Sequence, residues 1–288
     1  MTVRPGAGPS DAGDGWSGGW LDLRAAADDR TRSAALLNRL AALLPAGPHL
    51  LDVGCGTGAM QRWCAARLAT PARWTLLDPD PTLLTLAARR AGDSGDSLPR
   101  LLQASVDDLG PAVLAGVDAG VDAVVCSALL DVLTPTQVGH LVDVVVAGRV
   151  PLLASLTVTG HVTLTPSHPG DAAARRAVGR TAVADGASGP GAARLLRERA
   201  RQLGATVFYE SRPWRLTGEQ DHELVAAWTD GYVAAAQAGV PGTPAGTGVP
   251  GTPEGAELAG WARERRAAAR AGQLTVRVDH EDVLMVSA

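Results

Sequence analysis

The stretch HLLDVGCGTGAMQRW, residues 49–63, decides the fold of this chain. A short apolar run holding one acid, Asp52, leads into three glycines at alternate positions, Gly54, Gly56 and Gly58, and then into a segment of helical character. A strand that breaks into a glycine-rich turn at the start of a helix exposes bare backbone to a ligand. It also directs amide N–H groups and the positive helix end toward negative or polar ligand atoms. The stretch therefore predicts a strand, a ligand-binding turn and a helix.

Short apolar runs and helical segments alternate from this stretch onward. Strands are predicted at 49–54, 73–78, 99–105 and 121–130, and helices at 36–44, 59–69, 81–91 and 136–148. Thr134, Pro135 and Gln137 mark the start of the last of these helices as an N-cap, a proline at the first helical position and a capping-box partner. Such alternation is typical of a mainly parallel sheet with helices on both faces. The predicted fold class is α/β.

The second half of the chain is predicted to add further strands and helices. Residues 150–166 are long for one strand and alternate in their second half, so they either extend past the sheet or turn into a hairpin. Helices are predicted at 192–205 and 256–272, and strands at 206–216 and 273–287. Trp228 and Tyr232, four residues apart in a helical segment, either pack in the core or line a pocket.

Composition and charge exclude several classes of function. The 288 residues carry a formal net charge of −4, and all 26 basic residues are arginine, which excludes a lysine Schiff base and a P-loop lysine. An acidic chain is not expected to bind nucleic acid through its phosphates. Three scattered cysteines give neither metal-ligand spacing nor a disulfide framework. Without a signal peptide or a membrane span in the sequence, we expect a cytoplasmic monomer or homodimer with no metal and no membrane partner.

An acid follows the second predicted strand. Asp78 ends the segment 73–78, at a place where a carboxylate can accept both ribose hydroxyls of an adenosine. With this acid and the segment LLDVGCGTG, residues 50–58, the chain resembles the class I S-adenosylmethionine-dependent methyltransferases. A dinucleotide-binding fingerprint would need the glycine spacing G-x-G-x-x-G instead. The resemblance implies a Rossmann-like fold, with a mainly parallel sheet, an antiparallel last strand, and helices from the N-terminus and the second half as a cover.

The same resemblance implies S-adenosylmethionine as the cofactor, with its methionine end at the glycine turn. Ser105 stands where the family often has an acid that meets the adenine amino group. The cofactor-binding residues implied are Asp52, Gly54, Cys55, Gly56, Gly58, Asp78, Pro79, Ser105, Val106 and Cys126. The residues themselves leave two alternatives open. Asp52 is either a buried acid tied to backbone donors or a turn former, and the two cysteines also fit small apolar packing residues.

The segment DAVVCSALLDVL, residues 122–133, resembles the family's loop that faces the methyl group. Asp131 is the only acid on the part of this segment that faces the methyl group, and it is expected either to handle the acceptor's proton or to cap the turn before Thr134. His161 is the second catalytic candidate, with a solvated or core histidine as the alternative. The loop lacks the Asn/Asp-Pro-Pro-aromatic signature of adenine or glutamine methylation, and no Pro-Cys nucleophile is present. A small-molecule acceptor is therefore favoured.

The resemblance covers residues 49–150 directly and the rest by the order of elements, with 206–211 and 274–280 expected to pair as the antiparallel edge. We expect a flexible tail at 1–19 and a methyltransferase domain at 20–288. Its halves are a cofactor-binding part, 20–150, and an acceptor cover, 151–288, which holds a mobile insert at 239–255. The implied function is methyl transfer to an oxygen, nitrogen or carbon nucleophile. The alternatives are a non-catalytic S-adenosylmethionine-binding protein and a nicotinamide-dependent oxidoreductase.

Overall fold

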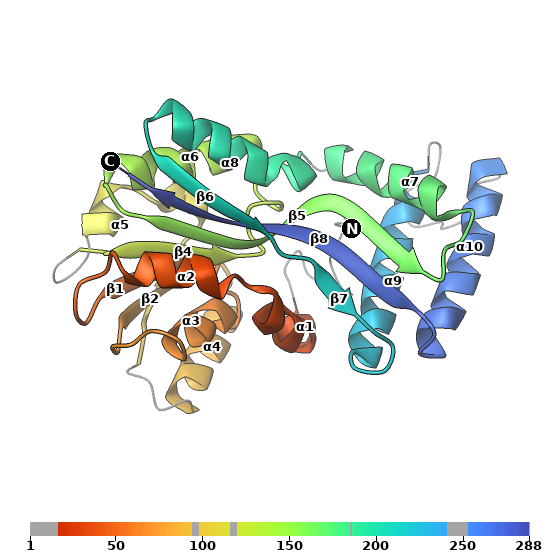
Figure 1. Ribbon diagram of the computed structural model, residues 1–288, viewed down its shortest axis with the longest axis horizontal. Coiled ribbons are helices and arrows are strands. Elements are labelled where there is room, and N and C mark those ends of the chain that lie inside the picture. The colour runs from red at the N-terminus through yellow and green to blue at the C-terminus, as the bar shows by residue number, and fades with distance from the viewer. Residues whose placement is uncertain (1–16, 94–97, 116–119, 185, 241–252, 288) are drawn as a thin grey trace. The chain divides into compact units, whose positions relative to one another are not determined.

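The computed structural model contains a mainly parallel sheet with helices on both faces (Figure 1). It describes residues 17–93, 98–115, 120–184, 186–240 and 253–287. The chain divides into two compact units. What we call the sheet unit comprises Asp29–Thr159, Pro190–Arg212 and His280–Ala288. The helical unit comprises Met1–Asp28, Gly160–Gly189 and Pro213–Asp279. Each unit is therefore assembled from segments that lie far apart in the sequence.

The strands follow the order β3-β2-β1-β4-β5-β8-β6, with β7 paired to β8. Their bounds are β1 His49–Val53, β2 Arg73–Asp78, β3 Arg100–Gln103, β4 Ala123–Ser127, β5 Leu152–Thr165, β6 Thr206–Ser211, β7 Trp214–Leu216 and β8 Thr275–Val286. Strands β1 to β5 pair in parallel, whereas β8 runs antiparallel to β6 and β7. The predicted fold class, a mainly parallel α/β sheet with an antiparallel last strand, is confirmed.

Most helices of the sheet unit begin where the sequence predicts them. Their bounds are α2 Ala34–Ala41, α3 Ala59–Ala65, α4 Pro81–Asp93, α5 Pro111–Ala115, α6 Pro135–Ala147 and α8 Ala192–Gln202, with short 3-10 turns η1 Val106–Asp108 and η2 Gly189–Gly191. Helix α1, Gly18–Thr31, leads into this unit. At the start of α6 the Thr134 hydroxyl accepts from the Gln137 N–H, and the Gln137 side chain accepts from the Thr134 N–H. The predicted capping box is confirmed.

The two faces of the sheet are buried under different helices, with α6 and α8 on one side and α2, α3 and α4 on the other (Figure 1). Leu51 belongs to the apolar cluster that contains Leu141 of α6 and Leu196 of α8. Leu50, the preceding residue of β1, belongs to the cluster that contains Leu40 of α2 and Trp63 of α3. Successive side chains of a strand point to opposite faces, so a strand covered on both faces needs a continuous apolar run. This explains the composition of HLLDV.

The helical unit packs α7 Asp171–Ala184, α9 His222–Ala238 and α10 Pro253–Arg270 around aromatic side chains. Trp228 and Tyr232 stack with ring centroids 4.7 Å apart, and Trp261 meets Tyr232 edge-on at 6.2 Å. All three are buried. The helical spacing of Trp228 and Tyr232 therefore reflects core packing, the first of the two alternatives left open by the sequence.

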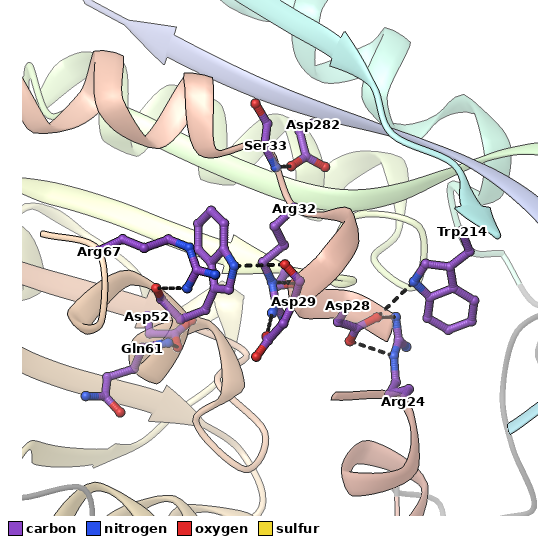
Figure 2. A network of polar contacts seen from close by, with 12 residues as sticks. Arg24, Asp28, Asp29, Arg32, Ser33, Asp52, Gln61, Arg67, Trp214 and Asp282 are labelled. Carbon is purple, nitrogen blue, oxygen red and sulfur yellow. Dashed lines mark hydrogen bonds and ion pairs between the residues drawn. The ribbon is translucent and has the colours of Figure 1, made fainter. Parts of the chain in front are cut away.

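Two ionic clusters that contain the buried arginines Arg24 and Arg265 complete the helical unit. Asp28 accepts from the Arg24 guanidinium at 2.9 Å and from the Trp214 indole N–H at 3.1 Å, as Figure 2 shows. Asp171 accepts from Arg265 at 2.6 Å and from the Trp261 indole N–H at 2.8 Å. Each carboxylate accepts hydrogen bonds from two different donors, which offsets the loss of water around the buried Asp28 and the half-buried Asp171.

The structure corrects the predicted course of the C-terminal strands. Residues 206–216 form two strands, β6 and β7, which are separated at Arg212 and Pro213, because proline has no N–H to give to a ladder. Residues 206–211 pair with 281–286 and not with 274–280, whereas 214–216 pair with 276–278. Of the two courses left open for 150–166, the structure has the extended one, since β5 runs unbroken over 14 residues.

Some residues at the boundaries of the predicted tail, 1–19, and of the predicted insert, 239–255, belong to helices, and the predicted cover half, 151–288, is not one unit. Gly18 and Gly19 belong to α1, and Pro253 begins α10, so these three residues are helical although they fall within the predicted tail and insert. Val240 is buried, because the end of α9 packs against α7 through the Arg180–Gly239 hydrogen bond. Residues 1–16 and 241–252 lie outside the described residues. The expected cover half, 151–288, is divided, since β5, α8, β6 and the end of β8 contribute to the sheet unit.

Candidate functional site

The glycine turn follows β1 directly. Gly54, Gly56 and Gly58 all adopt left-handed backbone angles, with φ of 63°, 54° and 77°. A residue with a side chain is strained in this region, so the turn needs glycine at all three positions. At Gly54 a Cβ atom would also lie 2.7 Å from Leu129 Cδ1, in the loop after β4. The turn therefore keeps its backbone bare and close to the neighbouring loop.

Asp78, at the end of β2, is tied to this turn. Its Oδ2 accepts from the Gly56 N–H at 2.9 Å, and its Oδ1 accepts from the Asp80 N–H at 2.9 Å. Burial raises the pKa of the Asp78 carboxyl, while the Asp80 and Gly56 N–H groups act in the opposite direction. A carboxylate has about four lone-pair sites, so two N–H bonds leave it able to accept hydroxyl groups of a ligand.

Asp52 lies fully buried at the end of β1. Its Oδ2 accepts from the Gln61 N–H in the first turn of α3, at 3.1 Å. Its Oδ1 has no hydrogen-bond partner among the described residues. Burial raises the pKa of this carboxyl to about 7, against the opposing effects of the Arg32 charge and the Gln61 N–H. Of the two alternatives for Asp52, the contacts support the buried acid that joins the turn to a backbone donor.

Arg32 is a residue of this site that the sequence analysis missed. Its side chain is buried, and its Nε donates to the Ser127 hydroxyl at the end of β4 over 3.2 Å (Figure 2 shows Arg32 beside Asp29). Its guanidinium pairs with Asp29, whose backbone oxygen accepts from the Trp63 indole N–H. No local pattern distinguishes this arginine from the chain's others, because its place depends on contacts with β4 and α3.

Asp282 of β8 was also missed. It is fully buried and accepts two backbone N–H groups, from Ser33 at 2.8 Å and from Leu156 at 2.8 Å. Figure 2 shows Ser33 and Asp282 in contact. Leu156 has a left-handed φ of 58°, an unusual conformation for a branched side chain. Burial raises the pKa of the Asp282 carboxyl. The last strand therefore fixes the junction between α1 and α2, where Arg32 lies.

The adenine-side candidates lie at the end of β3. Ser105 precedes η1 and donates its backbone N–H and its hydroxyl to Asp108, at 2.7 and 2.8 Å. Val106 is buried in the sheet unit's core. Pro79, an exposed residue after Asp78, accepts from the Gln103 side chain at 3.4 Å. The structure thus brings the predicted residues of β1, β2 and β3 to one edge of the sheet, at the carboxyl ends of parallel strands, where α/β folds bind ligands.

Cys55 and Cys126 are buried in apolar surroundings, and burial raises the pKa of each thiol well above its usual value. They pack as small apolar side chains, so neither is a reactive thiolate. Among the described residues, no group of three or more His, Cys, Asp or Glu side chains is arranged to hold a metal ion. The described helices include none with the length and apolar character needed to cross a membrane.

The two catalytic candidates belong to different units. Asp131 is half-buried in the loop after β4, in the sheet unit, and adds negative charge beside Cys126. His161 is exposed on the part of β5 that belongs to the helical unit. Of the two candidates, Asp131 lies at the same edge of the sheet as the glycine turn, because the turn follows β1, Asp131 follows β4, and these two strands are parallel.

Comparison with known proteins agrees with this geometry. Residues 50–147 match a family model described as a methyltransferase domain. Over 59 residues, 20% of this chain, the sequence is 51% identical to the biotin biosynthesis bifunctional protein BioCD of Bordetella avium, and the matched stretch spans 12% of that relative's length.

Two solved structures are similar in fold. The cyclopropane synthase MmaA2 from Mycobacterium tuberculosis is 15% identical, with 88% of this chain and 83% of that chain covered and a TM-score of 0.45. The YcgJ protein from Bacillus subtilis is 12% identical, with 88% and 97% covered and a TM-score of 0.48. The strand order, the glycine turn joined to Asp78 and the family match agree with one another, and residues 50–147 are a methyltransferase domain.

Proposed function

We propose that the protein transfers a methyl group from S-adenosylmethionine to an oxygen, nitrogen or carbon nucleophile of a small-molecule acceptor. The observation that carries this proposal is the Gly56–Asp78 hydrogen bond of 2.9 Å. This hydrogen bond holds the Asp78 carboxylate, which can accept ribose hydroxyls, next to the glycine turn, whose exposed backbone can bind the polar amino-acid end of a ligand. A nucleoside with an amino-acid extension fits both features at once.

The residues present fit this cofactor in chemical type. Asp78 keeps lone pairs for the two ribose hydroxyls, and the left-handed glycines leave room for the methionine end. Asp52, fully buried at the end of β1, offers a carboxyl oxygen as a hydrogen-bond acceptor on the side where an ammonium group would lie. Ser105 and Val106 lie at the end of β3, where the base would lie. These roles remain proposals for each residue.

When bound, S-adenosylmethionine supplies an electrophilic methyl group on a positively charged sulfur. The protein's own contribution is to hold the acceptor against the methyl group and to exclude water. Holding the two reactants in contact turns a reaction between two molecules in solution into a step within one complex. Asp131, on the loop after β4, is the residue proposed to accept or orient the proton that leaves an acceptor hydroxyl or ammonium group. His161 is the alternative for this role.

A binding experiment tests the proposal first. Calorimetric titration of the full chain should give heat with S-adenosylmethionine and with S-adenosylhomocysteine, and none with NAD. Binding of NAD alone would support the oxidoreductase alternative, and no binding of either sulfur ligand would overturn the proposal.

A transfer experiment separates the enzyme from a non-catalytic binding protein. The chain is incubated with S-adenosylmethionine that carries a labelled methyl group and with a small-metabolite extract. Label should move to a small molecule, whereas a protein that binds the cofactor without turnover would transfer none. The cytoplasmic location, the monomeric or dimeric state and the lack of a nucleic-acid partner stay predictions.

A further inference from the structure

A cavity in the sheet unit is lined by residues of β1, β2, β3 and α5. Its volume is about 180 Å³. The apolar part of its lining consists of Leu51, Leu102, Ala112, Val113 and Val121. An apolar cavity of about 150 Å³ in a protein core is large enough to bind benzene. This cavity therefore has room for an apolar group of about the size of a six-membered ring.

The length of α5 explains why this face of the sheet has a cavity. The register of the strands sets Leu51, Thr75 and Arg100 side by side across β1, β2 and β3. Neighbouring strands lie about 4.8 Å apart, so this row is about 10 Å wide. Helix α5 has only five residues and is about 7.5 Å long, whereas α6 has 13 residues. Because α5 is so short, it leaves part of the row without a covering side chain.

The cavity lies at the opposite edge of the sheet from the glycine turn. His49 and Arg100, which line it, are the first residues of β1 and β3. The glycine turn follows Val53, the last residue of β1. Four residues of extended strand span about 13 Å. A ligand in this cavity would therefore be separate from the cofactor of the proposed function.

Two of the polar side chains in the lining are already paired. The His49 ring Nδ1 lies 3.0 Å from the Gly120 carbonyl oxygen, and its Nε2 lies 2.9 Å from the Thr75 hydroxyl oxygen. A carbonyl oxygen can only accept, so Nδ1 carries the hydrogen, and Nε2 of the neutral ring accepts from the Thr75 hydroxyl. Both side chains are buried. Neither then has a hydrogen left to donate to a ligand.

Arg100 is the remaining polar side chain of the lining, and it carries a permanent positive charge. Arg100 and Ala112 are both exposed, so the cavity reaches the protein surface where these two residues lie. A guanidinium group offers two parallel N–H donors, which match the two oxygens of a carboxylate. The apolar lining and this one cation together fit a ligand that has an apolar body and a carboxylate.

We propose that this cavity binds a small carboxylic acid, with its apolar body against Leu51, Leu102 and Val121 and its carboxylate paired with Arg100. Burial of the apolar body supplies most of the affinity, because an exposed ion pair contributes little by itself. Arg100 sets the preference for an anion. The site is distinct from the glycine turn, so this proposal does not depend on the proposed function.

Three probes of similar size test the charge preference, namely benzoate, benzamide and benzylammonium. Ligand-observed NMR titration of the full chain at neutral pH measures their dissociation constants. Benzoate should bind with a dissociation constant of about 1 mM or lower, roughly 5-fold more tightly than benzamide, and benzylammonium should bind least tightly. Saturating S-adenosylhomocysteine should leave the affinity for benzoate unchanged, because the cavity and the glycine turn lie at opposite edges of the sheet.

Variants of two arginines at this edge separate a specific contact from the general effect of charge. Arg100→Gln should bring the ratio of benzoate to benzamide affinity close to one. Arg73, the first residue of β2, does not line the cavity, so Arg73→Gln is the matched control and should keep the wild-type ratio. Each ratio compares two ligands on one protein, so a change in overall stability does not mimic it.

Variants of α5 test whether the probes occupy the cavity. Ala112→Leu places a larger side chain in the lining and should weaken the binding of benzoate and of benzamide together, by roughly 10-fold or more. Ala115 is exposed on the same helix and does not line the cavity. Ala115→Leu is therefore the control and should leave both affinities unchanged.

Several outcomes would overturn the proposal. They are no binding of benzoate to the wild-type chain, equal binding of benzoate and benzamide, and a wild-type ratio in Arg100→Gln. Unchanged benzoate affinity in Ala112→Leu, or displacement of benzoate by S-adenosylhomocysteine, would place the probe outside the cavity and overturn it as well. The proposed function is tested separately, by the binding of S-adenosylhomocysteine to the wild-type chain.

Discussion

The backbone N–H of Gly56 donates to Asp78 Oδ2 over 2.9 Å and so joins the turn after β1 to the end of β2. The two residues are 22 positions apart in the sequence. Because β1 and β2 are parallel neighbours in the sheet, their carboxyl ends meet, and one carboxylate can orient the turn and still accept from a ligand. The ribose position and the shape of the turn are therefore coupled through a single side chain.

Replacing Asp78 with Ala should weaken S-adenosylhomocysteine binding by roughly 30- to 150-fold, on the order of 2–3 kcal/mol, because two charge-assisted hydrogen bonds to the ribose are lost. Calorimetric titration measures the change. Asp80→Ala, which removes a nearby acid that caps the Thr82 N–H, is the control and should alter the affinity by no more than about threefold. An unchanged affinity in Asp78→Ala would place the ribose elsewhere.

Asp52 should make the stability of the chain depend on pH. Burial raises its pKa from 3.8 to about 7, so the folded chain holds a proton that the unfolded chain releases. Its stabilising contribution is present below pH 4 and is lost as the pH rises to about 7. Asp52→Asn cannot ionise and should therefore gain stability relative to the wild type between pH 5 and pH 8, by up to about 4 kcal/mol. Urea unfolding of both proteins at pH 5 and at pH 8 measures the difference in their free energies of unfolding. The same difference at the two pH values would contradict the assignment of Asp52 as a buried acid with a raised pKa.

Gly54 and Gly47 share a φ of 63° but differ in surroundings, which makes them a matched pair. A Cβ atom added at Gly47 would have no neighbouring atom within 4 Å, whereas one added at Gly54 would lie 2.7 Å from Leu129 Cδ1. Gly47→Ala should cost only backbone strain, about 1–2 kcal/mol, and Gly54→Ala about 1 kcal/mol more. Urea unfolding of both variants gives the difference. Adding Leu129→Ala should remove most of the extra cost, and equal losses in the two single variants would refute the close contact.

Asp131→Asn tests the proton-handling role. The amide keeps the size of the side chain and much of its capping ability but cannot take a proton, so methyl transfer should slow by roughly 10²-fold or more while cofactor affinity stays nearly intact. Transfer of labelled methyl and calorimetric titration give the two readings on one variant. Full turnover would assign Asp131 to structure and favour His161. Loss of cofactor binding as well would show that the loop after β4 had collapsed.

The elements of the cofactor half could be predicted from the sequence because their signals are local. The apolar run of β1, the left-handed glycines after it and the capping box at Thr134 each act within a few residues. Asp78 could be predicted for the same reason, since it ends a strand of the expected length. A short segment by itself determines its local conformation, and the order of strand and turn within it determines at which edge of the sheet the turn will lie.

The tertiary structure alone decided the register of the last strands and the polar contacts beneath the site. Residues 206–211 alternate in a way that fits several antiparallel registers, and burial of the matching faces selects 281–286. Asp282 meets Ser33 across 249 positions and Leu156 across 126. Such contacts leave no local pattern, because a buried carboxylate is stable wherever the completed fold brings enough N–H donors to it. The sequence by itself thus determined which elements form and where a ligand meets the backbone, whereas the assembled fold chose the partners that hold this site in place.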